Sequence, residues 1–232
     1  MGNGQIGFIY LRVNSLDFYS SKSTNGAHLD FAQTSVRDLE LINKVELVEK
    51  IKSFVDQNKI PPSNIIIVLS DSVYFEKDFL DLPIDQQDIA VNNFLENVPF
   101  ESVASRLYTI ERGVKIVAAN KELYQAIKEA FESKGFVIES VTPSIILGSS
   151  LIDEAGGLNI DSVTTIFNKY NLLKQNNLDI NKISINTSSQ KKENPYKAEH
   201  TINKRLIVLA AFFVVLLVIL VMVIVSSFKN SS

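Results

Sequence analysis

The first stretch of the chain, "GQIGFIYLRVNSLDFYS" at residues 4–20, decides the fold prediction. Apolar and aromatic residues on both sides of Asn14-Ser15 predict two antiparallel strands, residues 5–13 and 15–21, joined by a tight turn at these two residues. A turn that holds a phosphate presents backbone N–H groups that a ligand can approach closely, usually with the help of glycine. This turn follows Arg12 and Val13, and no carboxylate precedes it. We therefore expect a hairpin with a structural role that does not bind a phosphate.

The rest of the chain alternates between the extended and the helical hydrophobic periods. Residues 28–34 predict a third strand, and residues 64–70 form a short β-branched run typical of a strand buried on both faces. The other expected elements, in chain order, are a helix at residues 45–58, a strand at 73–79, a helix at 85–99, two strands around Gly113, a helix at 121–135, a strand at 136–143, an apolar helix at 144–155 and a last helix at 161–177. Residues 176–203 are rich in Asn, Ser, Lys and Gln. This predicts a flexible linker, because such a segment buries too little apolar surface to offset chain entropy.

The longest apolar run, residues 206–225, has 20 consecutive apolar residues, among them Leu206, Phe212, Leu217 and Val225. A helix of that length spans about 30 Å, the thickness of the hydrocarbon core of a bilayer. The alternative, a helix buried in a soluble core, is disfavoured because such helices rarely lack a polar face over so many turns. We predict one transmembrane helix at residues 204–228, followed by a short exterior tail at residues 229–232.

The charges that flank this run predict its orientation. Positive residues precede it at Lys191, Lys192, Lys197, Lys204 and Arg205, whereas only Lys229 follows it. By the positive-inside rule, residues 1–205 are expected in the cytoplasm.

The composition excludes several kinds of catalytic and binding site. The 232 residues include no cysteine, which excludes disulfides and thiolate sites, and the two histidines, His28 and His200, lie far apart in the sequence. A net charge of −3 without a basic stripe argues against nucleic-acid binding. The cluster Ser70-Asp71-Ser72 has the most catalytic character, but a turn whose side chains bond to the backbone is the simpler interpretation. No catalytic residue, cofactor site or metal site is predicted.

The order of several local strings resembles a known family, the actin-like pilus-assembly protein PilM and its membrane-bound counterpart GspL of type II secretion. The resemblance covers about residues 5–155. It rests on the opening hairpin and on three further stretches: "NIIIVLSDSVYFEKDF" (64–79), "LDLPIDQQDIAVNNFLENVPFE" (80–101) and "VKIVAANKELYQAIKEAFESKGFVIESVTPSIILG" (114–148).

This resemblance implies an α/β (α+β) fold. We expect a partial actin-like (ribonuclease H-like) cytoplasmic domain at residues 1–157, with an inserted β-α-β-β-α-β lobe at about residues 73–143, and a mostly flexible linker at residues 158–203. Members of the family that bind ATP have a small Gly/Ser-rich turn after an aspartate, so Asn14 and Ser15 would be a degenerate phosphate turn. The second actin-like half, with its adenosine pocket, does not fit between residue 156 and the apolar run.

The expected function is a non-enzymatic scaffold at the inner (plasma) membrane, which binds other assembly-platform proteins of a type IV pilus or a type II secretion-like machine. The inserted lobe is the candidate partner surface, with Phe75, Arg106 and Arg112. The two arginines lie six apart on one expected strand and hence on one face, although solvent-facing charge is the alternative. Two other functions stay open: a tail-anchored adaptor unrelated to pili, and a divergent ATP-binding protein. The oligomeric state also stays open, including a homo-oligomer.

Overall fold

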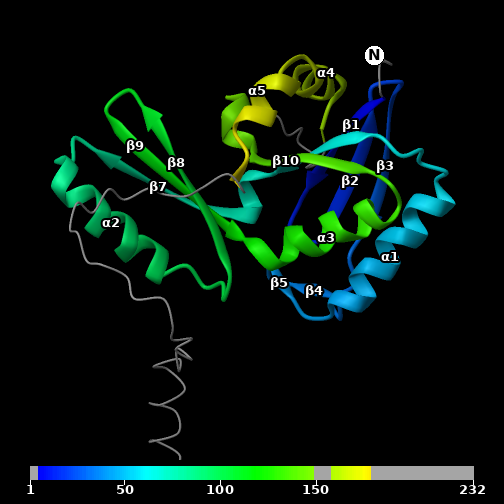
Figure 1. Cartoon of the computed structure of the whole chain (residues 1–232), viewed down its shortest axis with the longest axis horizontal. Coiled ribbons are helices and arrows are strands. Elements are labelled where there is room, and N and C mark those ends of the chain that lie inside the picture. The colour runs from blue at the N-terminus through cyan, green and yellow to red at the C-terminus, as the bar shows by residue number, and fades with distance from the viewer. Residues whose placement is uncertain (1–4, 149–157, 179–232) are drawn as a thin grey trace, which may run out of the picture. The chain divides into compact units, whose positions relative to one another are not determined.

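The structure, a computed structural model, describes residues 5–148 and 158–178. Contacts divide the chain into two units, Met1–Ile185 and Asn186–Ser232, and all the described residues lie in the first. Within that unit, strands and helices form a mixed α/β architecture, which confirms the predicted class (Figure 1).

The main sheet has five strands in the order β10-β6-β1-β2-β3 (Figure 1). These are β1 (Ile6–Leu11), β2 (Ser15–Ser20), β3 (Ser23–Asp30), β6 (Asn64–Leu69) and β10 (Val137–Pro143). The predicted hairpin is confirmed, because β1 and β2 are antiparallel and Leu11 lies opposite Leu16 beside the turn. β6 runs parallel to both β1 and β10. β3 begins before the predicted residue 28, because a tight turn lets Ser23 pair with Ser20.

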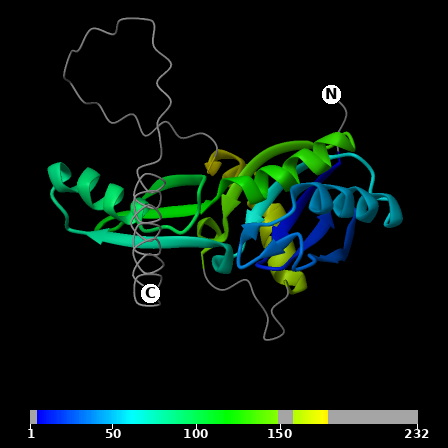
Figure 2. The same ribbon diagram turned by 90° about the horizontal axis from the view of Figure 1, so that it is seen from below.

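Helices cover both faces of this sheet (Figures 1 and 2). α1 (Lys44–Gln57) and α3 (Lys121–Ser133) pack against each other on one face, and α4 (Ile160–Asn168) and α5 (Tyr170–Gln175) lie on the other. β6 alternates between the two layers. Ile65 and Ile67 join the core with α1 and α3, whereas Ile66 and Val68 join the core with α4 and α5. This confirms the prediction of a strand buried on both faces.

The two helices of the first layer both begin at an asparagine cap. The side chain of Asn43 accepts a hydrogen bond from the N–H of Glu46, and that of Asn120 accepts from the N–H groups of Glu122 and Leu123. These bonds satisfy N–H groups that have no partner within the helix. A short two-stranded sheet of β4 (Val36–Arg37) and β5 (Glu40–Leu41) precedes α1.

A second, smaller sheet forms a lobe, defined here as residues 74–120. Its strands are β7 (Tyr74–Leu80), β8 (Val103–Ile110) and β9 (Gly113–Asn120) in the order β7-β9-β8, and α2 (Ile84–Glu96) packs on one face. Phe79, Val91 and Ile116 form the core between α2 and this sheet. Gly113 turns the chain from β8 to β9 at φ 149°, where an added Cβ would lie 2.0 Å from the carbonyl oxygen of Phe79. Only glycine fits that position.

The lobe is smaller than the expected residues 73–143. The last helix and strand of the predicted β-α-β-β-α-β unit, α3 and β10, belong to the main sheet and its first layer, because β10 pairs with β6. Ile127 and Phe131 of α3 are 0% exposed within the main core. The structure therefore inserts only β7, α2, β8 and β9 between two neighbouring strands of the main sheet.

Two further sequence interpretations are corrected. Of the helix expected at residues 144–155, the described part is a 3-10 turn, Ser144–Leu147, which ends where Gly148 adopts φ 76°; residues 149–155 lie outside the part of the chain that the structure describes. The linker expected from residue 158 does not start there, because α4 and α5 occupy residues 160–175. Their apolar residues Val163, Ile166, Tyr170 and Leu173 recur at helical spacing and are buried on the second face of the sheet.

Several predictions concern residues outside those that the structure describes. They are the linker from residue 179 onward, the basic residues from Lys191 to Arg205, and the apolar run at residues 206–225. Among the described residues, no helix is long and apolar enough to cross a membrane.

The buried strand provides a test of this core. Ile67→Ala should lower the free energy of unfolding by about 2–5 kcal/mol, because Ile67 is 0% exposed and its truncation leaves a cavity. Ile89→Ala in α2 is the matched control, since Ile89 is 64% exposed, and it should change stability by less than about 0.5 kcal/mol. Urea unfolding measures both, and equal effects of the two substitutions would contradict the burial pattern.

Candidate functional site

The turn at Asn14 and Ser15 lies at the carboxyl end of β1, where strands of mixed α/β sheets commonly present ligand-binding loops. The turn is closed by its own backbone: the N–H of Arg12 donates to the carbonyl oxygen of Ser15 at 2.8 Å. The carbonyl oxygen of Asn14 accepts from the N–H of Phe31 at 2.7 Å, just after β3. Both turn residues therefore contribute backbone bonds to the sheet.

A polar cluster lies beside this turn. Arg12 pairs with the carboxylate of Asp17, whose side chain is only 8% exposed. The other oxygen of Asp17 lies 2.6 Å from Nδ1 of His28, and Nε2 of His28 lies 3.1 Å from Asp30. A buried carboxylate needs charged or hydrogen-bonding partners, and Asp17 has one from the turn and one from β3.

The charge state of His28 follows from these contacts. Its hydrogen bond to Asp17 raises the pKa of His28 above the ordinary value, burial opposes this rise, and the hydrogen bond to Asp30 adds to it. The sequence interpretation missed the cluster because it considered the histidines only by their separation along the chain. The signal was the register of the second hairpin, which places Asp17 directly opposite His28.

The carboxyl ends of β6 and β10 carry further polar side chains. Oγ of Ser70 lies 2.8 Å from Oγ of Ser72, and the hydroxyl of Tyr74 lies 3.3 Å from Oγ of Ser144. Burial raises the pKa of Tyr74 above its ordinary value. The segment Ser70-Asp71-Ser72 lies in a turn, as predicted, since Asp71–Val73 is a 3-10 turn and the N–H of Val73 donates to the carbonyl oxygen of Ser70. The side chain of Ser70 bonds to that of Ser72, where a bond to the backbone was expected.

The three candidate partner-surface residues lie in different parts of the lobe. Phe75 of β7 is 41% exposed and its ring packs on Phe100, with 5.5 Å between centroids. Through β9, Phe75 is in register with Ala118 and Arg106 with Val117, so the two side chains point to opposite faces of the lobe sheet. Arg112 lies in the turn after β8 and pairs with Asp81. The prediction that Arg106 and Arg112 share one strand and one face is therefore wrong.

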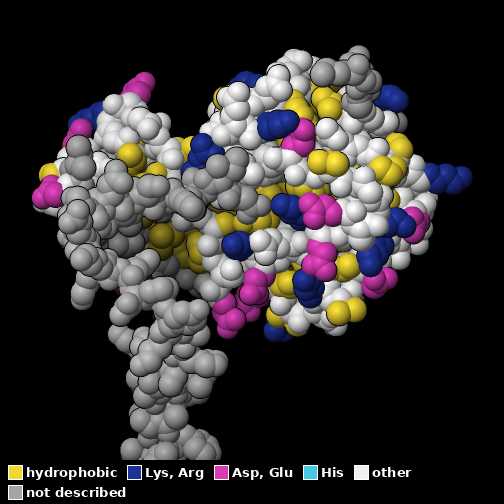
Figure 3. All heavy atoms as spheres, in the orientation of Figure 1, with side chains coloured by type: hydrophobic (Ala, Val, Ile, Leu, Met, Phe, Trp, Pro, Cys, Tyr) yellow, Lys and Arg dark blue, Asp and Glu magenta, His cyan; other side chains and the backbone are white. Residues whose placement is uncertain are grey.

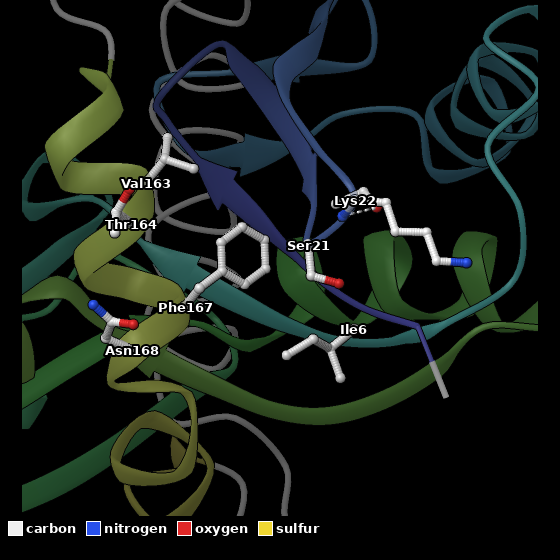
Figure 4. A pocket seen from close by; sticks show the side chains of 8 residues that line it. Ile6, Ser21, Lys22, Val163, Thr164, Phe167 and Asn168 are labelled. Carbon is white, nitrogen blue, oxygen red and sulfur yellow. Dashed lines mark hydrogen bonds between the residues drawn. The ribbon is translucent and has the colours of Figure 1, made fainter. Parts of the chain in front are cut away.

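A cavity of about 560 Å³ lies away from these residues (Figure 4). Val163, Thr164, Phe167 and Asn168 of α4 line one wall, and Ile6 and residues 20–22 line the other. In Figure 4 the ring of Phe167 points toward the hairpin, whereas the amino group of Lys22 points away from α4. Because Ile6 begins β1, this cavity is at the opposite end of that strand from Asn14. None of the predicted site residues lines it.

Charges of both signs are interspersed on the main part of the face drawn in Figure 3. Ion pairs join charged residues of α1 and α3, as between Lys44 and Glu129 at 2.6 Å, or residues within α1, as between Lys52 and Glu49 at 2.9 Å. Exposed pairs of this kind contribute little to stability, typically less than about 1 kcal/mol each.

Comparison with known proteins gave partial structural likenesses. No protein-family model matches the chain, and no curated protein matches it. Among solved structures, the PilM-PilN type IV pilus biogenesis complex is similar at 15% identity and a TM-score of 0.40, over 60% of this chain and 47% of that chain. The cytoplasmic domain of EpsL, an inner membrane component of the type II secretion system of Vibrio cholerae, is similar at 14% identity and a TM-score of 0.40, over 63% and 60% of the two chains.

A third similar structure is a Bacteroides thetaiotaomicron protein with an actin-like ATPase fold and unknown function, at 13% identity and a TM-score of 0.32, over 61% of this chain and 52% of that one. The chain thus spans about half to three fifths of the length of these proteins. At these TM-scores the likeness does not establish the family of the chain.

The cluster at Asp17 predicts a pH-dependent stability. Because the folded-state pKa of His28 lies above its unfolded value of about 6.5, protonated His28 stabilises the fold. This contribution is fully present below pH about 6.5 and is lost as the pH rises through the folded-state pKa. The difference in free energy of unfolding between the wild type and His28→Asn, measured in urea, should therefore be larger at pH 5.5 than at pH 8.5.

A chemical-shift titration of His28 tests the same contacts directly. Asp30→Asn should lower the titration midpoint only in part, since the bond to Asp17 remains. A midpoint at or below the ordinary histidine value in the wild type would contradict the structure.

Proposed function

We propose that the chain is a membrane-anchored, non-catalytic scaffold of a type IV pilus or type II secretion-like assembly platform, built on an actin-like domain. Its folded part lies in the cytoplasm at the inner membrane, and it acts by contacts with other platform proteins. The assignment to this class of machine comes from the sequence resemblance of residues 5–155. The mixed sheet that opens with the β1–β2 hairpin supports it.

The observation that supports the scaffold function is that polar groups at the carboxyl ends of β1, β6 and β10 bond to one another. Arg12 is held by Asp17, and the turn is closed by its own backbone bond and by Phe31. The hydroxyls of Ser70 and Tyr74 bond to Ser72 and Ser144. A phosphate group would have to replace several of these bonds at once, whereas a phosphate cradle offers preorganised N–H groups. This arrangement favours a structural hairpin over an ATP site.

The membrane anchor is supported by the 20 apolar residues at 206–225 and by the five basic residues between Lys191 and Arg205 that precede them. The length of the run matches a bilayer, and the charge asymmetry favours a cytoplasmic position for the folded part. The basic residues would also be attracted to anionic lipids of the inner leaflet.

Nucleotide binding separates the scaffold from an ATPase. In isothermal titration calorimetry of the full-length chain in detergent, Mg-ATP at millimolar concentration should give no saturable heat, because the turn residues are bonded within the sheet. Saturable binding that Arg12→Ala alters would show that the turn does hold a phosphate, and would overturn the non-catalytic assignment.

Removal of the apolar run tests the anchor. Deletion of residues 206–225 should move the protein from the carbonate-washed membrane fraction to the soluble fraction and abolish its function in assembly. The double substitution Asn14→Gly, Ser15→Gly is the control, and it should change neither the fractionation nor the function. Extraction of the full-length chain by carbonate would contradict the membrane anchor. A pull-down of the full-length chain that returned no pilus or secretion component would favour an adaptor of another system.

A further inference from the structure

The chain that leaves α5 lies between the lobe and the main sheet. Residues 175–178, called the strap here, begin at the last residue of α5 and end the described part of the chain. Leu178 is 2% exposed and belongs to the large core that α1, α3 and both sheets share. The strap is therefore a packed segment with neighbours on two sides.

On the lobe side, two residues of β8 bind the backbone of the strap. Nη1 of Arg106 donates to the carbonyl oxygens of Gln175 and Asn177 at 3.3 and 2.9 Å. The hydroxyl of Tyr108 donates to the carbonyl oxygen of Asn176 at 3.4 Å. The guanidinium carbon of Arg106 lies 5.4 Å from the centroid of the Tyr108 ring, so the two side chains form one platform. The last carbonyls of a helix have no partner within it, and Arg106 supplies one from a distant part of the sequence.

On the other side, the strap bonds to an edge of the main sheet. Among the strands that the structure describes, β10 is the terminal one of that sheet, and β6 is its neighbour. The N–H of Val141 donates to Oδ1 of Asn177 at 3.0 Å. The side chain of Asn177 thus takes the place that a further strand would occupy at this point of the edge. An uncovered edge is a surface to which other chains can add a strand.

The strap and β6 are held in different ways. Side chains of β8, the amide of Val141 and the burial of Leu178 hold the strap, whereas β6 is paired with a strand on both edges and buried on both faces. A segment outside the strand ladder opens at a lower free energy than a strand in the centre of the core.

We infer that the strap is a releasable cover, which closes the edge of β10 and the open face of the lobe, and whose release exposes both. The exposed groups would be main-chain groups of β10 together with Arg106 and Tyr108, which bind backbone carbonyls regardless of side chain. This inference goes beyond the scaffold function and does not depend on it.

Amide hydrogen exchange of the full-length chain in detergent tests the inference. In the wild type, amides of the strap and of Val141 should exchange faster than those of β6, since they open without global unfolding. Arg106→Ala and Asn177→Ala should each raise exchange at Val141 by about tenfold or more, as expected for the loss of one or two hydrogen bonds. Leu178→Ala should give the same pattern through lost packing.

Arg112→Ala is the matched control, because it removes an arginine of the same lobe whose partner is Asp81 and not the strap. It should leave exchange at Val141 unchanged. Protection of the strap equal to that of β6 in the wild type would overturn the inference. The same would follow if Arg106→Ala and Asn177→Ala accelerated β6 as much as β10, because the strap would then open only with the whole domain.

Discussion

The burial of β6 on both faces, with a strand on each edge, is the constraint on which the rest of the structure depends. Its residues from Ile65 to Leu69 are at most 1% exposed, so each face of the sheet needs its own helical layer. α1 and α3 supply one layer and α4 and α5 the other. The lobe enters after β6 and the chain returns through β10, which lies next to β6. The side chain of Asn120 fixes the return, because it caps α3 and donates to the carbonyl oxygen of Leu39 at 2.9 Å.

The sequence predicts elements well where the hydrophobic period is strong, as in β6, α1 and α3. It fails where the choice depends on a neighbour far along the chain. Residues of β10 alternate in the same way whether they join the lobe or the main sheet, and only pairing with β6 decides between them. The residues of α4 and α5 were expected to form a helix at 161–177, but within a segment treated as mostly linker because the residues after it are polar. Their four apolar residues suffice because one face of β6 would otherwise stay uncovered.

The same distinction separates the predicted from the missed features of the site. The turn at Asn14 and Ser15 could be predicted because it depends only on residues that are neighbours in the sequence. The contact of Asp17 with His28 depends on the register of β2 with β3 and could not be derived from either residue type. The error at Arg106 and Arg112 came from an assumed continuous strand. The positive φ of Gly113 turns the chain there and places Arg112 in the turn beside Asp81.

The Asp17 cluster and the strap follow one physical rule, since polar groups removed from water keep hydrogen-bond partners. The rule also limits how the strap surface can work. A segment that displaced residues 175–178 would exchange their carbonyl bonds to Arg106 and Tyr108 for equivalent bonds of its own, so these bonds would give it little net advantage. The difference must come from side chains, above all from the apolar group that replaces the buried Leu178. Backbone bonds would therefore set the path of a segment that replaced the strap, and the side chain that took the place of the buried Leu178 would set its selectivity.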